Sequence, residues 1–77
     1  MTAKEMFEKA RVKPVKDDGN LIIYNDYGTL IRFNRKFKLV EFVVSIPTYE
    51  EESVEYDCES DVFLAITQQM KELGWIE

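Results

Sequence analysis

The 77-residue chain contains no histidine and one cysteine, Cys58. Without histidine, the Ser-His and Cys-His nucleophile pairs cannot form, and the commonest general base is missing. The sequence therefore predicts no catalytic residue, and we expect a protein that is not an enzyme. A single cysteine cannot form an internal disulfide, which favours a reducing, cytoplasmic compartment.

Long apolar runs and metal-ligand patterns are also missing. No run approaches the roughly 20 apolar residues that span a bilayer, and the polar start MTAKEMFE does not resemble a signal peptide. Asp57, Glu59 and Asp61 have the spacing that begins a calcium loop, but Val62 and Gln68 stand where that loop requires Gly and Glu. We therefore expect no metal, no cofactor and no membrane partner.

The composition is that of a folded chain. Apolar residues make up 45% of the sequence, whereas disordered chains combine low hydrophobicity with high net charge. A chain of this length has room for one small core. We expect a single domain that spans residues 1–77.

Acidic and basic residues are concentrated in different segments. The segment 50–61 contains seven acids and no base, and the segment 32–38 contains four bases and no acid. The acids are Glu50, Glu51, Glu52, Glu55, Asp57, Glu59 and Asp61, and the bases are Arg32, Arg35, Lys36 and Lys38. This separation predicts two surfaces of opposite charge.

The first half of the chain has the pattern of a short helix followed by a β-meander. Thr2 and Glu5 have the spacing of a capping box, which predicts a helix from this point that ends before Pro14. Alternating apolar residues and turn sequences predict strands over 12–17, 21–24, 29–34 and 37–46. The alternation in 53–58 is compatible with a fifth strand or with an extended approach to a helix. The predicted sheet core is Ile31, Phe33, Val40, Phe42 and Val44.

The last part of the chain has a helical period. From about Ser60 to Leu73 an apolar stripe recurs every three or four residues, and Gly74 stands where a left-handed residue would end the helix. The stripe is Phe63, Ile66, Met70 and Leu73, with Val62 and Gln69 at its border. The predicted fold is α+β: a two-layer sandwich with a short N-terminal helix, an antiparallel meander of four or five strands, and a C-terminal helix packed on one face.

Two features have competing interpretations. Cys58 is either an activated thiol or, as we expect from how often free cysteine is buried, a core-facing strand residue. The basic segment around Arg35 and Lys36 lies near three aromatic residues, Tyr27, Phe33 and Phe37. It is either a single-strand-binding stripe or, as we expect, a solvated hairpin tip whose aromatic rings turn inward.

The two ends of the chain resemble a known group of proteins. The start MTAKEMFE and the end AITQQMKELGWI are similar to small, uncharacterised proteins encoded by phages and prophages of Gram-positive bacteria. This resemblance implies an accessory protein in the cytoplasm of a bacterial host. It assigns no functional residue.

We expect a non-enzymatic protein that binds an unidentified protein partner through an acidic and aromatic surface. The candidate partner-binding residues are Glu50, Glu51, Glu52, Glu55, Arg35 and Lys36. The alternative is nucleic-acid or nucleotide binding through the basic tip from Arg32 to Lys38, which the net charge of −5 disfavours. A homodimer is compatible with surplus aromatic surface and a free sheet edge.

Overall fold

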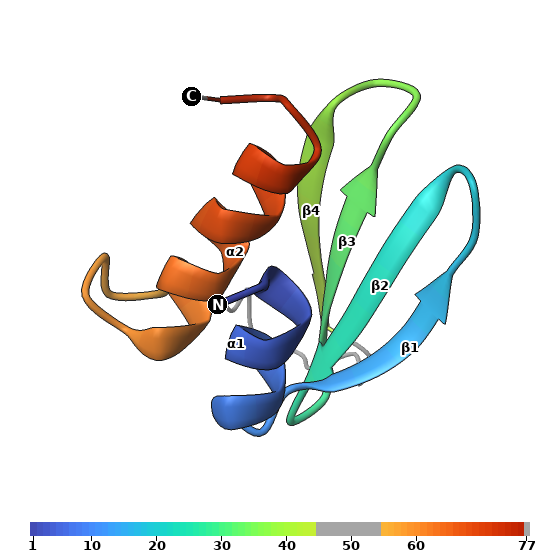
Figure 1. Cartoon of the computed structure of the whole chain (residues 1–77). Helices are drawn as coiled ribbons and strands as arrows, with labels where there is room; N and C mark the ends of the chain where they lie inside the picture. The colour runs from blue at the N-terminus through green and yellow to red at the C-terminus, as the bar shows by residue number, and fades with distance from the viewer. Residues whose placement is uncertain (45–54, 77) are drawn as a thin grey trace. The chain divides into compact units, whose positions relative to one another are not determined.

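The computed structural model describes residues 1–44 and 55–76. Its elements are α1 (Ala3–Lys9), β1 (Lys13–Asp17), β2 (Leu21–Asp26), β3 (Thr29–Asn34), β4 (Leu39–Val44) and α2 (Asp61–Glu72). The strands form one antiparallel sheet in the order β1-β2-β3-β4, which is a meander (Figure 1). The α+β class, the helix at each end and the meander between them are confirmed.

The chain divides into two compact units. The helical unit comprises Met1–Val12 and Tyr56–Glu77, and the sheet unit comprises Lys13–Glu55. The expected packing of the C-terminal helix on one face of the sheet concerns the relation between these units and stays a prediction. No helix in the described ranges is long and apolar enough to cross a membrane.

Local hydrogen bonds cap helix α1 at both ends. The Thr2 hydroxyl accepts from the Glu5 N–H at 3.2 Å, and the Glu5 carboxylate accepts from the Thr2 N–H, so the capping box is confirmed. At the other end, Arg11 adopts a left-handed φ of 63°, and the Val12 N–H donates to the Phe7 carbonyl at 2.9 Å. This arrangement is a Schellman motif with arginine in the position that usually holds glycine.

Helix α2 begins and ends where the sequence predicts. Ser60 is its N-cap, Gly74 has a φ of 76°, and the Trp75 N–H donates to the Met70 carbonyl at 2.9 Å. Ile66 of the predicted stripe is buried, whereas the other three stripe residues are half-buried. The remaining buried residues of this helix are Ala65 and Gln69, so the buried face is shifted from the predicted stripe. The fully buried small side chains of Ala3 and Ala65 are typical of helices that approach closely.

The turns of the sheet account for its strand lengths. Tyr27 and Gly28 both have positive φ, which suits the right-handed twist of a two-residue hairpin between β2 and β3. The strand predicted from Phe37 instead begins at Leu39, because Asn34 Oδ1 accepts from the N–H groups of Lys36 and Phe37 and holds a polar turn there. The end of that predicted strand, residues 45–46, lies outside the described residues.

Fewer residues of the sheet are buried than the sequence predicts. Ile31 and Phe33 are fully buried, and the Phe33 ring meets that of Tyr24 edge to face at a centroid distance of 6.4 Å. Val40 is half-buried, whereas Phe42 and Val44 are exposed, so their assignment to the core is wrong. These two residues lie on β4 at the end of the strand order, where a side chain has sheet neighbours on one side only.

For the segment before α2, the sequence is compatible with either a fifth strand over 53–58 or an extended approach to the helix. Residues 53–54 lie outside the described range, and Glu55 to Cys58 belong to no strand, which favours the extended approach to the helix. Cys58 is exposed, so its prediction as a buried strand residue is wrong. Strand alternation does not govern its side chain, because Cys58 lies in the turn that leads to Ser60.

Candidate functional site

The predicted partner-binding residues fall into three groups. Glu50, Glu51 and Glu52 lie outside the described residues. Glu55 is exposed, and Arg35 and Lys36 are exposed in the turn between β3 and β4. The acidic segment continues as Asp57, Glu59 and Asp61, which are all exposed just before or at the start of α2.

These last acids have a local structural role. Asp57 Oδ1 accepts from the Glu59 N–H at 2.9 Å, and the Ser60 hydroxyl accepts from the Phe63 N–H at 3.1 Å. Negative charge is favourable at a helix N-terminus, where the first N–H groups point outward. The part of the chain that the structure describes contains no cluster of three or more potential metal ligands.

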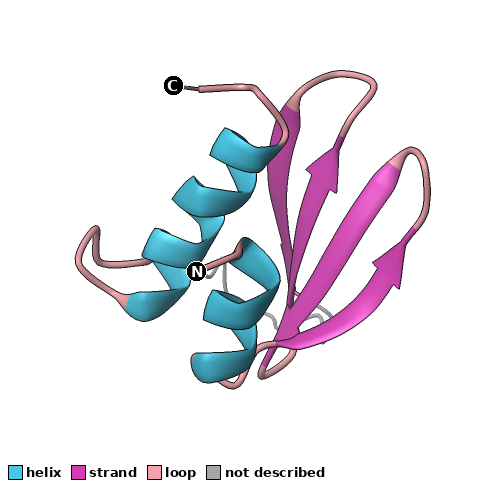
Figure 2. Ribbon diagram, viewed as in Figure 1, coloured by secondary structure: helices cyan, strands magenta, loops and turns pink. Residues whose placement is uncertain are grey.

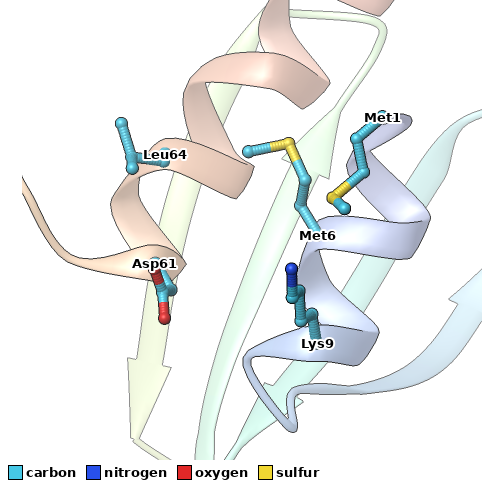
Figure 3. Close-up of a pocket in the computed structure, with 5 residues that line it drawn as sticks. All are labelled: Met1, Met6, Lys9, Asp61 and Leu64. Atoms are coloured by element: carbon cyan, nitrogen blue, oxygen red, sulfur yellow. The ribbon is translucent and has the colours of Figure 1, made fainter.

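A cavity of about 190 Å³ lies between α1 and α2, close to this acidic turn (Figure 3). Its lining residues are Met1, Met6, Lys9, Asp61 and Leu64. Met6 extends from α1 toward α2, while Asp61 and Leu64 lie on the first turns of α2 (Figure 3). The cavity therefore combines an apolar floor with one cation and one anion on opposite helices.

The apolar part of this cavity is accessible. Leu64 is 46% exposed and Met1 71% exposed, so apolar side chains that line the cavity reach solvent. Methionine adapts its shape to different partners because its side chain is flexible and polarisable. An apolar centre with a charged rim is the ordinary anatomy of a protein interface.

Glu72 links the helices that form the cavity. One of its carboxylate oxygens accepts from the Ala3 N–H at 2.6 Å and from Gln68 Nε2 at 3.0 Å. The first N–H groups of α1 have no partner within their own helix, so a carboxylate supplied by α2 satisfies one of them. This contact fixes the start of α1 against the end of α2 and so constrains the two walls of the cavity.

A second surface, here called the basic turn, comprises Arg35, Lys36, Phe37 and Lys38. Phe37 is 63% exposed, and the Lys36 ammonium lies 5.4 Å from the centre of its ring. Lys38 has a φ of 55° and precedes β4. The expectation that the aromatic rings turn inward is therefore wrong for two of the three: Phe33 is buried, whereas Tyr27 and Phe37 face solvent.

The basic turn is anchored to the turn between β1 and β2, which lies at the same end of the sheet (Figure 2). The Arg35 N–H donates to the Asn20 carbonyl at 2.9 Å, and its guanidinium lies 3.9 Å from the Asp17 carboxylate. Lys36 and Lys38 form no ion pair with the described residues. Two cations beside an exposed ring thus remain available to an anionic ligand.

Asp18 stabilises the neighbouring turn. Hydrogen bonds from the Asn20 and Leu21 N–H groups, followed by the contact with the Lys16 ammonium, lower the pKa of the Asp18 carboxyl to about 2. Asp18 is therefore ionised throughout the physiological range. Its partners are supplied within the turn, so it serves the hairpin instead of an external ligand.

Sequence reasoning missed the cavity of the helical unit. None of its lining residues Met6, Lys9 and Leu64 was a candidate binding residue. One signal was present: Leu64 is an apolar residue outside the predicted stripe of α2, so it had to face away from that stripe. No family model matches the chain, and no curated protein or solved structure matches it.

Proposed function

We propose that this protein is a non-enzymatic accessory protein that binds another protein through the surface around the α1–α2 cavity. The observation that carries this proposal is the pairing of an accessible apolar hollow, lined by Met1, Met6 and Leu64, with the acidic turn before α2. Protein interfaces place a few apolar anchors inside a polar rim.

The charge of this surface indicates the chemistry of the partner. Asp57, Glu59 and Asp61 are exposed, and Lys9 is the one base among the described residues that line the cavity. A partner that presents an apolar side chain beside lysine or arginine would fill the hollow and face the acids. Complementary charge would act mainly on partner choice and on the rate of association.

The proposal is tested by crosslinking followed by binding measurements. A photo-crosslinking residue replaces Leu64 in the full chain, and a second version carries it at Tyr27, which is 85% exposed in the sheet unit. The proteins captured in expressing cells are identified by mass spectrometry. We expect one protein to be captured from position 64 and not from position 27.

Binding of that purified protein is then measured by calorimetry. Leu64→Asp and Glu59→Lys should each weaken binding by about tenfold or more, because the first charges an apolar anchor and the second reverses an acidic contact. Lys4→Glu, at an exposed position of α1 that is not among the lining residues, is the matched control and should bind normally. Equal affinity of all three variants would contradict the proposed surface.

The basic turn supports a second candidate function, the binding of single-stranded nucleic acid. An exposed Phe37 flanked by Lys36 and Lys38 provides a ring on which a base can stack and cations for the phosphates. The net charge of −5 opposes this function.

Titration with single-stranded oligonucleotides at low and moderate salt decides this second candidate. A phosphate-driven contact must weaken as salt rises, and Phe37→Ala should remove the stacking contribution of about 1–3 kcal/mol per base. Tyr27→Ala, which removes an exposed ring elsewhere on the sheet unit, is the control. Absence of binding at low salt eliminates this function.

The biological setting is part of the same proposal. The resemblance of MTAKEMFE and AITQQMKELGWI to phage and prophage proteins supports an origin in a phage or prophage, with action in the cytoplasm of a bacterial host. The neighbouring reading frames in the genome test this origin, because phage genes are grouped. A locus without any phage gene would count against it.

A further inference from the structure

One face of the sheet carries an unusual pair of charges, and we call it the Arg32 face. Its apolar and charged residues on β2, β3 and β4 are Leu21, Ile23, Leu30, Arg32, Leu39, Glu41 and Val43, which alternate with the buried positions of β2 and β3. None of these seven residues is fully buried, and Leu39 is 51% exposed. The centre of the face on these three strands is therefore apolar apart from one cation and one anion. Asn25 and Asn34 lie toward its ends, and Lys13 and Lys16 lie on the neighbouring strand β1.

Arg32 and Glu41 are direct cross-strand neighbours on β3 and β4. Both side chains are half-buried, yet they form no ion pair with each other or with any other residue that the structure describes. The Nε atom of Arg32 is buried without a hydrogen-bond partner in the described chain. Buried donors almost always have an acceptor, so this N–H needs an oxygen that the described chain does not supply, from water or from a partner.

We propose that the Arg32 face binds the same face of a second copy of this chain, with Arg32 of each copy paired to Glu41 of the other. A two-fold axis that runs along the strands between β3 and β4 places β3 of one copy over β4 of its partner. Every contact then occurs twice, as in any isologous dimer. Each Arg32 gains the acceptor that it lacks, in a charge-assisted hydrogen bond.

The same axis matches the apolar residues of the face. Leu30 is the cross-strand neighbour of Val43, so the axis that exchanges Arg32 and Glu41 also sets Leu30 of one copy over Val43 of the other. Ile23 lies beside Arg32 on β2 and flanks this contact. Apolar and charged positions therefore both meet complementary groups, which a random partner surface would not supply.

The size of this surface sets the expected affinity. Strands lie about 4.8 Å apart and rise about 3.4 Å per residue, so two or three six-residue strands cover roughly 200–300 Å² in plan on each copy. Interfaces that bury less than about 1,200 Å² in total belong to weak, transient complexes. The dimer should therefore form in a concentration-dependent way.

The edge strand β1 is a poorer route to self-association. It contains Pro14, which has no N–H to donate, and it has Lys13 and Lys16 as well as an irregular register between Pro14 and Lys16. Proline, lysine and bulges are the features that keep sheet edges from pairing with other chains. The face, and not this edge, is the self-complementary surface.

Sedimentation velocity from micromolar to near-millimolar concentration tests the proposal. The unmodified chain should shift from monomer to dimer, whereas Arg32→Glu and Glu41→Arg should each weaken association by about tenfold or more, because each places like charges opposite one another. An equimolar mixture of the two variants should dimerise again, since one chain then presents acids at both positions and the other presents bases. Lys4→Glu and Glu8→Arg carry the same charge changes on α1 and should behave like the unmodified chain.

A variant-free measurement covers the case in which a charge reversal prevents folding. On dilution of the unmodified chain, the NMR amide signals of Leu30, Arg32, Glu41 and Val43 should move, and those of β1 should not. A chain that stays monomeric at every concentration overturns the proposal. So does a dimer whose dilution shifts lie elsewhere, or a mixture of folded variants that does not associate. Binding of the protein partner at the helical unit is a separate readout that these outcomes do not affect.

Discussion

Glu72 is the residue whose replacement most directly tests how the helical unit is held together. Its carboxylate accepts from the Ala3 N–H at 2.6 Å and from Gln68 Nε2 at 3.0 Å, across a separation of 69 residues in the first case. In Glu72→Ala both donors lose their acceptor. In Glu72→Gln a neutral acceptor of the same shape remains.

The expected loss of stability follows from the type of hydrogen bond that Glu72 accepts. A hydrogen bond to a charged group contributes about 1.5–3 kcal/mol, and a carboxylate at a helix N-terminus about 0.3–1 kcal/mol. Glu72 is exposed, so water and salt compensate part of this, and we expect Glu72→Ala to lower the free energy of unfolding by about 1–2 kcal/mol. A chain of this length has a total of about 4–12 kcal/mol. Glu72→Gln should lose roughly half as much as Glu72→Ala.

Urea denaturation and thermal melting followed by circular dichroism measure this difference. At about 4–8 °C per kcal/mol, Glu72→Ala should lower Tm by about 5–15 °C with an unchanged urea m value. Glu8→Ala removes another exposed glutamate of the helical unit, one near the C-terminus of α1, and should stay within about 0.5 kcal/mol of the unmodified chain. If Glu72→Ala is as stable as Glu8→Ala, the carboxylate does not hold the two helices together.

Three further predictions concern local strain, pH and the core. Arg11→Gly should raise the free energy of unfolding in urea by about 0.5–1 kcal/mol, because glycine tolerates the φ of 63° at the end of α1, whereas Arg11→Ala should give no gain. Asp18 should titrate in NMR with a pKa of about 2. Because this pKa is depressed, the contribution of Asp18 to hairpin stability is complete above the unfolded-state pKa of about 3.9 and is lost as the pH falls through about 2. An ordinary pKa in the folded state would contradict the hydrogen bonds from the Asn20 and Leu21 N–H groups. Phe33→Ala should lower the free energy of unfolding by about 3–5 kcal/mol and Phe33→Leu by much less, because Phe33 is fully buried against Tyr24. A cooperative melt of Phe33→Ala near the Tm of the unmodified chain would exclude Phe33 from the core.

Local sequence determined the secondary structure and most of the positions at which the helices and strands begin and end. Thr2, Ser60 and Gly74 occupy the cap positions that their side chains or their freedom of φ predict, and strand 29–34 has the predicted bounds. These features depend on hydrogen bonds between residues a few positions apart, so the sequence contains everything needed to infer them. The predicted start of β4 was wrong because the Asn34 side chain accepts hydrogen bonds from two N–H groups of the preceding turn.

The candidate surfaces were decided by tertiary structure. The exposure of Cys58, the burial of Gln69 and the isolated charge of Arg32 are not visible in any periodicity. Periodicity states which residues share a face, but it does not state how much of that face a neighbouring element covers. The cavity between α1 and α2 depends on two segments that the chain separates by more than fifty residues. Contacts of this kind follow from the packing of whole elements, and for that reason only the tertiary structure reveals them.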